Sequence, residues 1–385
     1  MSRRVSATIH LGALRSNLAR IRSLAPRSRV MAVVKADGYG HGLERTVLAL
    51  SEADAFGVAS IADGERIRAL GLPHRIVVLS GIDQAGDLAR MRALSLEPVI
   101  HHESQLTLIR REWPGVPGYS AFDVAADAST SHTPTTSQAV WIKLDTGMHR
   151  LGFAPRRARE VLEEMRALPG VGQVHLMTHF ANSDVAGDPL TSAQMQRFEE
   201  ICSEARKCNL PFAPQSLANS AGIAAFPASH RDWVRAGGLL YGISVVAGQS
   251  GLERGFEPAM TLTARLIAIN EVGVGEGVGY GHAWRAARST RVGVLAVGYA
   301  DGYPRSIRPE TPVLISGARV PIIGRVSMDL TAIDLTDLPG VDVGEEAVLW
   351  GRGLPVEEVA KAAGTIGYEL VCGMTRRVDF IDDDG

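Results

Sequence analysis

The stretch Val30-Met31-Ala32-Val33-Val34-Lys35-Ala36-Asp37-Gly38-Tyr39-Gly40-His41-Gly42 indicates how this chain is organised. Its apolar run, Val30 to Val34, is typical of a strand that is buried on both faces. One lysine ends the run, and a glycine-rich turn follows it at once. Burial lowers the pKa of a lysine and frees its amine to attack carbonyl groups, as in Schiff-base lysines. The alternative is that Lys35 simply extends from a strand end to solvent.

Length and charge limit the class of protein. The 385 residues, with a formal net charge of −2, are enough for two domains and a large core. Charges of both signs are mixed and no basic stripe occurs, so we expect no nucleic-acid partner. We find no secretory signal and no apolar run that could span a bilayer, and therefore expect no membrane partner. The three cysteines fit neither a metal site nor a disulfide framework, so we expect a cytoplasmic protein without a metal.

Apolar runs alternate with amphipathic stretches in the first two thirds of the chain. The predicted strands cover 30–35, 55–60, 76–81, 97–102, 139–145, 174–181, 215–220 and 233–240. The predicted helices between them include 43–53, 62–70, 103–112, 156–168 and 189–208. This repeated alternation predicts an α/β fold, a (β/α)8 TIM barrel over residues 11–245. A doubly wound open sheet is the alternative, but the glycines after the first strand lack the GxGxxG spacing.

The remaining residues, 246–385, predict a mostly β C-terminal domain. β-branched, alternating segments occur at 258–271, 290–298, 312–323, 330–335 and 346–350, with a helix at 356–363. A strand within residues 1–10 could join this domain, because it precedes the first barrel helix. We interpret 113–138 as a long loop on the N-terminal face of the barrel, away from the catalytic mouth.

Polar residues gather where the predicted barrel strands end. The C-terminal ends of barrel strands carry the chemistry in TIM-barrel enzymes. Here those ends hold Lys35, Lys143 with Asp145, His179, Asn219 with Ser220, and Arg235. Each residue alone could be structural, but packing does not require such a set at one mouth.

The Lys35 stretch and several further motifs resemble the alanine racemase family over nearly the whole chain. The motifs in the barrel are Lys143–Gly152, Thr178–Asn182, Ala218–Ser220 and Val234–Gly237, and those in the β-domain are Gly279–Gly281, Gly298–Tyr303, Gly324–Asp329 and Gly367–Glu369. The resemblance implies a pyridoxal 5′-phosphate (PLP) enzyme that interconverts L- and D-alanine and supplies D-alanine for cell-wall peptidoglycan. It also implies a homodimer with shared active sites.

Racemisation needs a base on each face of the substrate, and the resemblance names both. Lys35 carries PLP and serves as one base, and Tyr280 of the partner subunit is the other. A phenol titrates near pH ~10, so a tyrosine base needs cationic or hydrogen-bonding neighbours. The family pattern suggests His179 and Arg235 as those neighbours.

The resemblance places Arg235 at the pyridine nitrogen of PLP. A guanidinium has no proton to give at neutral pH, so it can only donate a hydrogen bond to an unprotonated nitrogen. This weakens the ring as an electron sink and makes transamination less frequent. The alternative is an interior arginine paired with a carboxylate.

The other site residues also follow from the resemblance. The PLP phosphate is expected on the hydroxyls of Tyr39, Ser220 and Tyr368 and on backbone amides near Asn219 and Gly237. Arg150 is expected at the PLP phenolic oxygen and the substrate carboxylate, while Tyr299 and the backbone N–H of Met328 come from the other subunit. Lys143 matches a position that is often a carbamylated lysine, and its alternative is an ion pair with Asp145.

Rival functions are testable against the same residues. Three tyrosines crowd the expected pocket, which favours alanine, but a serine or broad-specificity amino-acid racemase remains an alternative. A decarboxylase of the same architecture would offer an acidic residue to the pyridine nitrogen and a cysteine at the partner's position, where this chain has Arg235 and Tyr280. A PLP-carrier protein would resemble the barrel alone.

Overall fold

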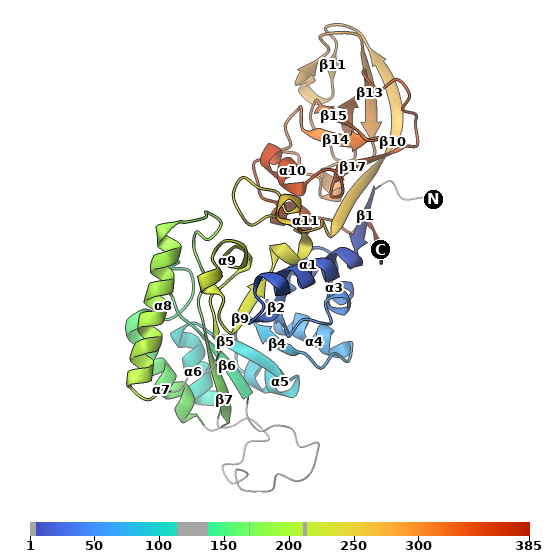
Figure 1. Cartoon of the computed structure of the whole chain (residues 1–385). Coiled ribbons are helices and arrows are strands. Elements are labelled where there is room, and N and C mark those ends of the chain that lie inside the picture. Colours follow the sequence, from blue (N-terminus) through green and yellow to red (C-terminus); the bar gives the residue numbers. More distant parts are fainter. Residues whose placement is uncertain (1–4, 114–137, 169, 211–213) are drawn as a thin grey trace.

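The computed structural model describes residues 5–113, 138–168, 170–210 and 214–385. A barrel with its surrounding helices forms one body, and a β-domain is stacked on it end to end (Figure 1). The predicted loop 113–138 falls on residues 114–137, which lie outside the described residues. Its described ends are Trp113, which is buried after helix α6, and Gln138, which begins strand β6.

Eight parallel strands build the barrel, as the sequence predicts. They are β2 (Arg29–Val33), β3 (Ala55–Val58), β4 (Arg75–Val78), β5 (Leu96–Ile100), β6 (Gln138–Lys143), β7 (Val171–Met177), β8 (Gln215–Ser216) and β9 (Trp233–Ala236). Their order, β8-β7-β6-β5-β4-β3-β2-β9, makes neighbours of the first and last strands, β2 and β9. The barrel is nearly closed between β8 and β9, where the backbone N–H of Arg235 donates to the Ala218 carbonyl over 2.9 Å.

Several predicted strands are too long at their C-terminal ends. The strand predicted over 215–220 is only Gln215–Ser216, and that predicted over 174–181 stops at Met177. Lys35 is likewise not part of β2, which ends at Val33. The chain turns away where polar side chains begin, so the candidate site residues follow the strands rather than continue them.

Helices cover the outside of the barrel. They are α1 (Leu11–Leu24), α3 (Leu43–Ala49), α4 (Ile61–Ala69), α5 (Asp87–Ala93), α6 (Glu103–Glu112), α7 (Ala158–Ala167), α8 (Pro189–Lys207) and α9 (Ser220–Ala225). The longest, α8, begins at Pro189, and the Asp188 side chain caps it by accepting from the Leu190 N–H over 2.8 Å. No described helix is both long and apolar enough to cross a membrane.

A polar cluster links neighbouring strands of the barrel. Arg75 donates twice to Glu97, over 2.6 and 2.9 Å, and once to His175 over 2.9 Å. The Trp141 indole also donates to Glu97, over 2.7 Å, and the Arg75 guanidinium lies 5.3 Å from the Trp233 ring. Burial, together with Arg75, lowers the pKa of His175 to about 3, so this ring remains a neutral acceptor. Glu97 therefore joins three barrel strands.

The β-domain is a second eight-stranded sheet with two helices. Its strands are β1 (Val5–His10), β10 (Met260–Val272), β13 (Thr290–Leu295), β14 (Pro312–Ile315), β15 (Ala318–Ile323), β16 (Thr331–Asp334), β17 (Glu346–Trp350) and β18 (Asp379–Asp383), and its helices are α10 (Val356–Ala363) and α11 (Gly367–Cys372). A separate hairpin pairs β11 (Gly277–Val278) with β12 (Trp284–Arg285).

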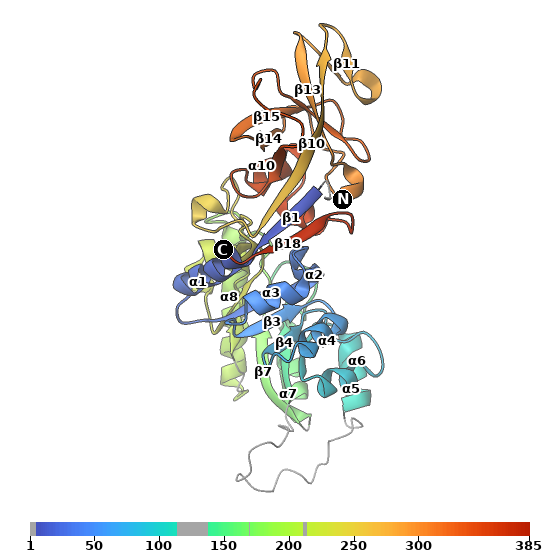
Figure 2. The same ribbon diagram turned by 90° about the vertical axis from the view of Figure 1, so that its right-hand side faces the viewer.

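The N-terminal strand joins the β-domain, as the sequence indicates. β1 lies between β10, to which it is antiparallel, and β18, to which it is parallel (Figure 2). The alternating segment 312–323 forms two strands, because the chain reverses at Ser316 and Gly317, where the sequence also indicates a turn. Helix α11 and strand β18 are absent from the sequence prediction. The division of domains between residues 245 and 246 stays a prediction.

The polar cluster generates a stability prediction. Glu97→Ala should lower the free energy of unfolding by about 2–3 kcal/mol, because it leaves Arg75 and the Trp141 indole without their acceptor. Glu65→Ala, which removes an exposed carboxylate paired with Arg90, should leave the free energy of unfolding almost unchanged. Urea unfolding followed by tryptophan fluorescence would measure both. Equal losses in the two variants would contradict a structural role for this cluster.

Candidate active site

A left-handed turn carries Lys35 and Tyr39 out of the barrel. Helix α2 (Lys35–Tyr39) follows β2, but Ala36, Asp37, Gly38 and Tyr39 have φ between 52° and 62°. Two backbone hydrogen bonds of 2.9 Å hold the turn, from Gly38 to Val34 and from Gly40 to Ala36. A left-handed residue other than glycine costs roughly 1–2 kcal/mol, so this conformation is maintained by its surroundings.

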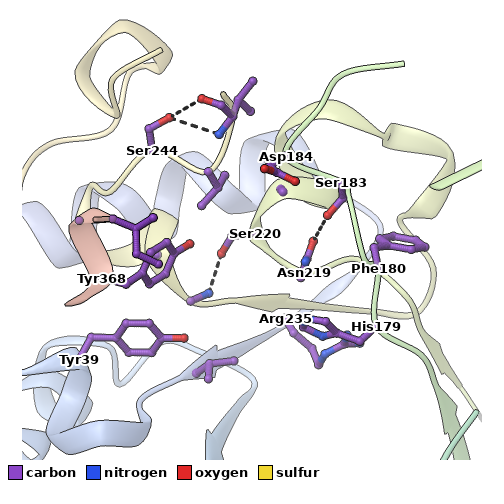
Figure 3. Close-up of a pocket in the computed structure, with 18 of the residues that line it drawn as sticks. Tyr39, His179, Phe180, Ser183, Asp184, Asn219, Ser220, Arg235, Ser244 and Tyr368 are labelled. Atoms are coloured by element: carbon purple, nitrogen blue, oxygen red, sulfur yellow. Dashed lines mark hydrogen bonds between the residues drawn. The ribbon is translucent and has the colours of Figure 1, made fainter. Parts of the chain in front are cut away.

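One pocket of about 1550 Å³ opens at this end of the barrel. It lies between the ends of the barrel strands and the β-domain elements α10 and α11. Ten residues that the sequence predicts for the site line it: Lys35, Tyr39, Lys143, Arg150, His179, Asn219, Ser220, Arg235, Gly237 and Tyr368. Figure 3 shows Tyr39 and Tyr368 on one side of this space and His179 and Arg235 on the other.

Arg235 is a buried cation held by neutral acceptors. Its guanidinium donates to the Ser216 carbonyl and hydroxyl, over 2.9 and 2.8 Å, and to the Thr178 carbonyl over 2.6 Å. No carboxylate of the described residues lies within ion-pair distance of it, so the alternative of a paired interior arginine is wrong. Burial lowers the pKa of Arg235 to about 10, and the group stays charged at neutral pH. The His179 Nδ1 lies 3.5 Å from Nη2.

Hydroxyl groups converge on two adjacent glycines at the other side of the pocket. The Gly237 N–H donates to the Ser220 hydroxyl over 2.8 Å. A Cβ on Gly237 would lie 2.7 Å from the Tyr39 hydroxyl, and one on Gly238 would collide with the hydroxyl of Tyr368. Burial raises the pKa of both phenols, that of Tyr39 to about 12, so both remain hydrogen-bond donors. This corner offers donors and no side chain that would fill it.

The Asn219 side chain has a structural task in the same corner. Its carbonyl oxygen accepts from the Gly222 N–H over 2.9 Å, which caps helix α9, and from the Ser183 hydroxyl over 3.0 Å. The Asn219 amide thereby links the start of helix α9 to the segment that carries Ser183. The backbone next to Asn219, rather than its side chain, therefore remains available for a ligand.

Four cations dominate the electrostatics of the pocket. Burial is the first cause that lowers the pKa of His179 to about 2, and the charges of Arg235, Lys143, Arg150 and Lys35 follow. Burial also lowers the pKa of Lys35, with Arg150 as the second cause, and that of Lys143 to about 8. The site thus combines a neutral imidazole with amines that deprotonate easily, in surroundings that favour anions.

Asp145 does not serve Lys143 as an ion-pair partner. One of its oxygens accepts the backbone N–H groups of Gly147, Met148 and His149, over 3.0 to 3.1 Å, and the other contacts His149 Nδ1 at 2.9 Å. This carboxylate instead organises the turn that leads to Arg150. Lys143 and Arg150 both line the pocket.

Three predicted site residues lie elsewhere. Tyr280, Tyr299 and Met328 are on the β-domain, do not line this pocket, and are 70%, 40% and 53% exposed. Their segments adjoin one another, since the Tyr299 N–H donates to the Ser327 carbonyl over 3.0 Å and a Cβ on Gly324 would lie 3.0 Å from the Val278 carbonyl. The chain therefore presents a second, separate group of candidate residues on its surface.

Residues that the sequence does not predict for the site also support the pocket. The Tyr241 ring stacks on Tyr39 with centroids 4.8 Å apart, and the buried Gln194 amide donates to the His179 carbonyl over 3.0 Å. Tyr241 directly follows the strand predicted over 233–240, Gln194 lies within the helix predicted over 189–208, and neither residue belongs to a motif that indicates the site. Thr178, whose carbonyl holds Arg235, is signalled only by its place next to His179.

Comparison with known proteins gives full-length matches. Residues 9–245 match the family model "Alanine racemase, N-terminal domain" and residues 259–381 match "Alanine racemase, C-terminal domain". The alanine racemase of Shewanella woodyi is 44% identical over 377 residues, which are 97% of each chain. The crystal structure of the biosynthetic alanine racemase from Pseudomonas aeruginosa superimposes with a TM-score of 0.89 at 42% identity, covering 99% of each chain. That of the enzyme from Acinetobacter baumannii has a TM-score of 0.87 at 35% identity, covering 99% of this chain and 100% of the other.

The lowered pKa of Lys143 predicts a pH-dependent stability difference. The folded-state value of about 8 lies below the ordinary 10.5, so folding disfavours the charged amine. This penalty is complete below pH about 8 and disappears as the pH rises to 10.5, because the unfolded chain binds more protons in that window. Lys143→Met should therefore stabilise the protein at pH 7 in bicarbonate-free buffer, by a margin that shrinks above pH 8.

Urea midpoints of the two proteins across pH 7 to 10.5 would measure this margin. Lys207→Met, which replaces an exposed lysine near the end of α8, is the matched control and should show no such trend. If the difference in stability between the two proteins did not change with pH, folding would not disfavour the charged form of Lys143.

Proposed function

The chain belongs to the alanine racemase family and is an isomerase that interconverts L-alanine and D-alanine; we propose that it does so with PLP at Lys35 and with one base from each of two subunits. The observation that carries the proposal is the pocket of four cations, three hydroxyls and two glycines that follows the barrel strands. The product D-alanine would serve cell-wall peptidoglycan. The free thiols of all three cysteines fit the reducing cytoplasm.

The residues of the pocket fit PLP. The phosphate suits the corner at Gly237 and Gly238, where the hydroxyls of Tyr39, Ser220 and Tyr368 converge. Adding a Cβ to either glycine would fill that corner, so the space and the donors belong together. When bound, PLP supplies an electron sink that makes the α-proton of an amino acid acidic enough for removal by a side chain.

Arg235 would adjust that sink from the other end of the pocket. Its guanidinium stays protonated and is fixed by carbonyl and hydroxyl oxygens, so it offers a hydrogen bond but no proton to a ring nitrogen. A neutral His179, with its pKa lowered to about 2, stands next to it. We infer that this pair favours return of the proton to the α-carbon.

Lys35 and Tyr280 would be the two bases. Burial and the nearby charge of Arg150 lower the pKa of Lys35, which favours the uncharged amine that a base requires. The exposed Tyr280 does not line this chain's own pocket, so we assign it to the pocket of a second copy. Tyr299 and Met328 adjoin it and would complete the substrate end of that pocket.

Arg150 would hold the substrate carboxylate, and Lys143 would orient Arg150. With a pKa of about 8, part of the Lys143 amine is uncharged at neutral pH, and only the uncharged amine reacts with carbon dioxide to give a carbamate. A carbamate would place a negative charge beside Arg150 and relieve the crowding of cations. We therefore propose that Lys143 is carbamylated, with Arg150 oriented by it.

The first test of the function combines an assay with a label. The purified protein should racemise L-alanine, and borohydride reduction should link the cofactor covalently to Lys35, one of four lysines in the chain. Peptide mass spectrometry would locate the label. Parallel assays with L-serine and other amino acids would decide between an alanine and a broad-specificity racemase. A label on Lys143, Lys207 or Lys361 would contradict the assignment.

The shared site is tested by mixing two defective variants. Lys35→Ala and Tyr280→Phe should each be impaired as homodimers. A heterodimer has one site that takes Lys35 from one chain and Tyr280 from the other, so activity should return to about half of the wild-type value per heterodimer. Heterodimers purified with two affinity tags and assayed for L-alanine racemisation would measure this. If both residues acted within one chain, every site would stay defective.

A further inference from the structure

The surface that carries Tyr299 and Met328 is built from two segments joined through their backbones. Tyr299 begins the short helix η8 (Tyr299–Asp301), and its N–H donates to the Ser327 carbonyl over 3.0 Å. The next N–H, that of Ala300, donates to the Met328 carbonyl, also over 3.0 Å. A Cβ on Gly298 would collide with that carbonyl, so the two segments touch without side chains between them.

Arg377 spans both segments. Its Nε lies 3.0 Å from a carboxylate oxygen of Asp301, in the first segment, and its Nη2 donates over 2.6 Å to Asp329, in the second. Asp301 is 4% exposed, and its other oxygen accepts from the Gly298 N–H over 3.0 Å. A nearly buried carboxylate is unfavourable without a paired cation, so removing Arg377 should cost more stability than breaking an ordinary surface pair.

The segment that supplies Arg377 is itself fixed to η8. The Thr375 N–H donates to the Asp301 carbonyl over 3.2 Å, and the Thr375 hydroxyl donates to the Ala300 carbonyl over 2.8 Å. The Arg377 N–H in turn donates to that hydroxyl over 3.3 Å. These hydrogen bonds fix the backbone of Arg377 at a position from which its guanidinium contacts both carboxylates.

We propose that Arg377 is a positioning residue for the substrate end that this chain presents to the active site of its partner. The inference rests on the proposed function, in which Tyr299 and Met328 act in the other subunit. Removing the guanidinium releases Asp329 and leaves the Asp301 carboxylate buried without its cation. The two segments then lose their common support, and a displacement of about 1 Å at a substrate contact costs up to about a hundredfold in rate.

The proposal predicts an effect in trans, which a purely structural role would not produce. In the heterodimer of Lys35→Ala and Tyr280→Phe chains, the complete site takes Tyr280, Tyr299 and Met328 from the Lys35→Ala chain. Arg377→Ala on that chain should raise the KM for alanine about tenfold or more, with cofactor absorbance unchanged. Arg377→Ala on the Tyr280→Phe chain should leave the KM within about twofold of the reference heterodimer.

The two heterodimers contain the same three substitutions, so any general loss of stability is equal in both. Equal KM values in the two arrangements would overturn the role of Arg377 while the reference heterodimer remained active. An inactive reference heterodimer would overturn the shared site, and this proposal with it. Asp329→Asn, which keeps Asp301 paired, is the milder variant and should show the same asymmetry at smaller size. Arg376→Ala, which removes an exposed neighbouring arginine, should show none.

Discussion

The pairing of β2 with β9 is the constraint on which the candidate site depends. Four register pairs, from Arg29 opposite Trp233 to Ala32 opposite Ala236, bring the first and last barrel strands together across some two hundred residues of chain. Only this pairing places the Tyr39 hydroxyl against Gly237, and hence the donor corner beside the lysine turn. The donor corner therefore depends on closure of the barrel, because neither β2 nor β9 forms it alone.

The pocket brings buried cations together, which lowers the stability of the fold. Lys35, Lys143, Arg150 and Arg235 face one space. Burial first and these four charges second lower the pKa of His179 to about 2. Such a gathering of cations is unfavourable without anions and favourable with them. A phosphate and a carboxylate are the two anions that an amino acid bound to PLP would bring. The site is thus electrostatically complementary to its occupied state.

The sequence predicts the barrel and its order of elements well, because parallel strands buried on both faces are continuous apolar runs. It predicts strand ends poorly: β8 is two residues long where six are expected, since polar residues at a strand mouth leave the ladder. The candidate site residues come mainly from the resemblance, and ten of them share one pocket. Supporting residues such as Tyr241 and Arg377 were missed, because their partners are fixed by tertiary structure and leave no local pattern.

The left-handed turn after β2 restricts which sequences this fold can accept. Ala36, Asp37 and Tyr39 occupy backbone angles that β-branched residues can hardly adopt. Gly40 is left-handed as well and must be glycine, because an added Cβ would overlap the Val371 carbonyl. Few residue types are therefore tolerated at these consecutive positions: glycine, alanine, asparagine, aspartate, and an aromatic residue only where its packing stabilises the left-handed backbone. The sequence after Lys35 is thus restricted by the stereochemistry of the backbone as well as by the chemistry of the lysine.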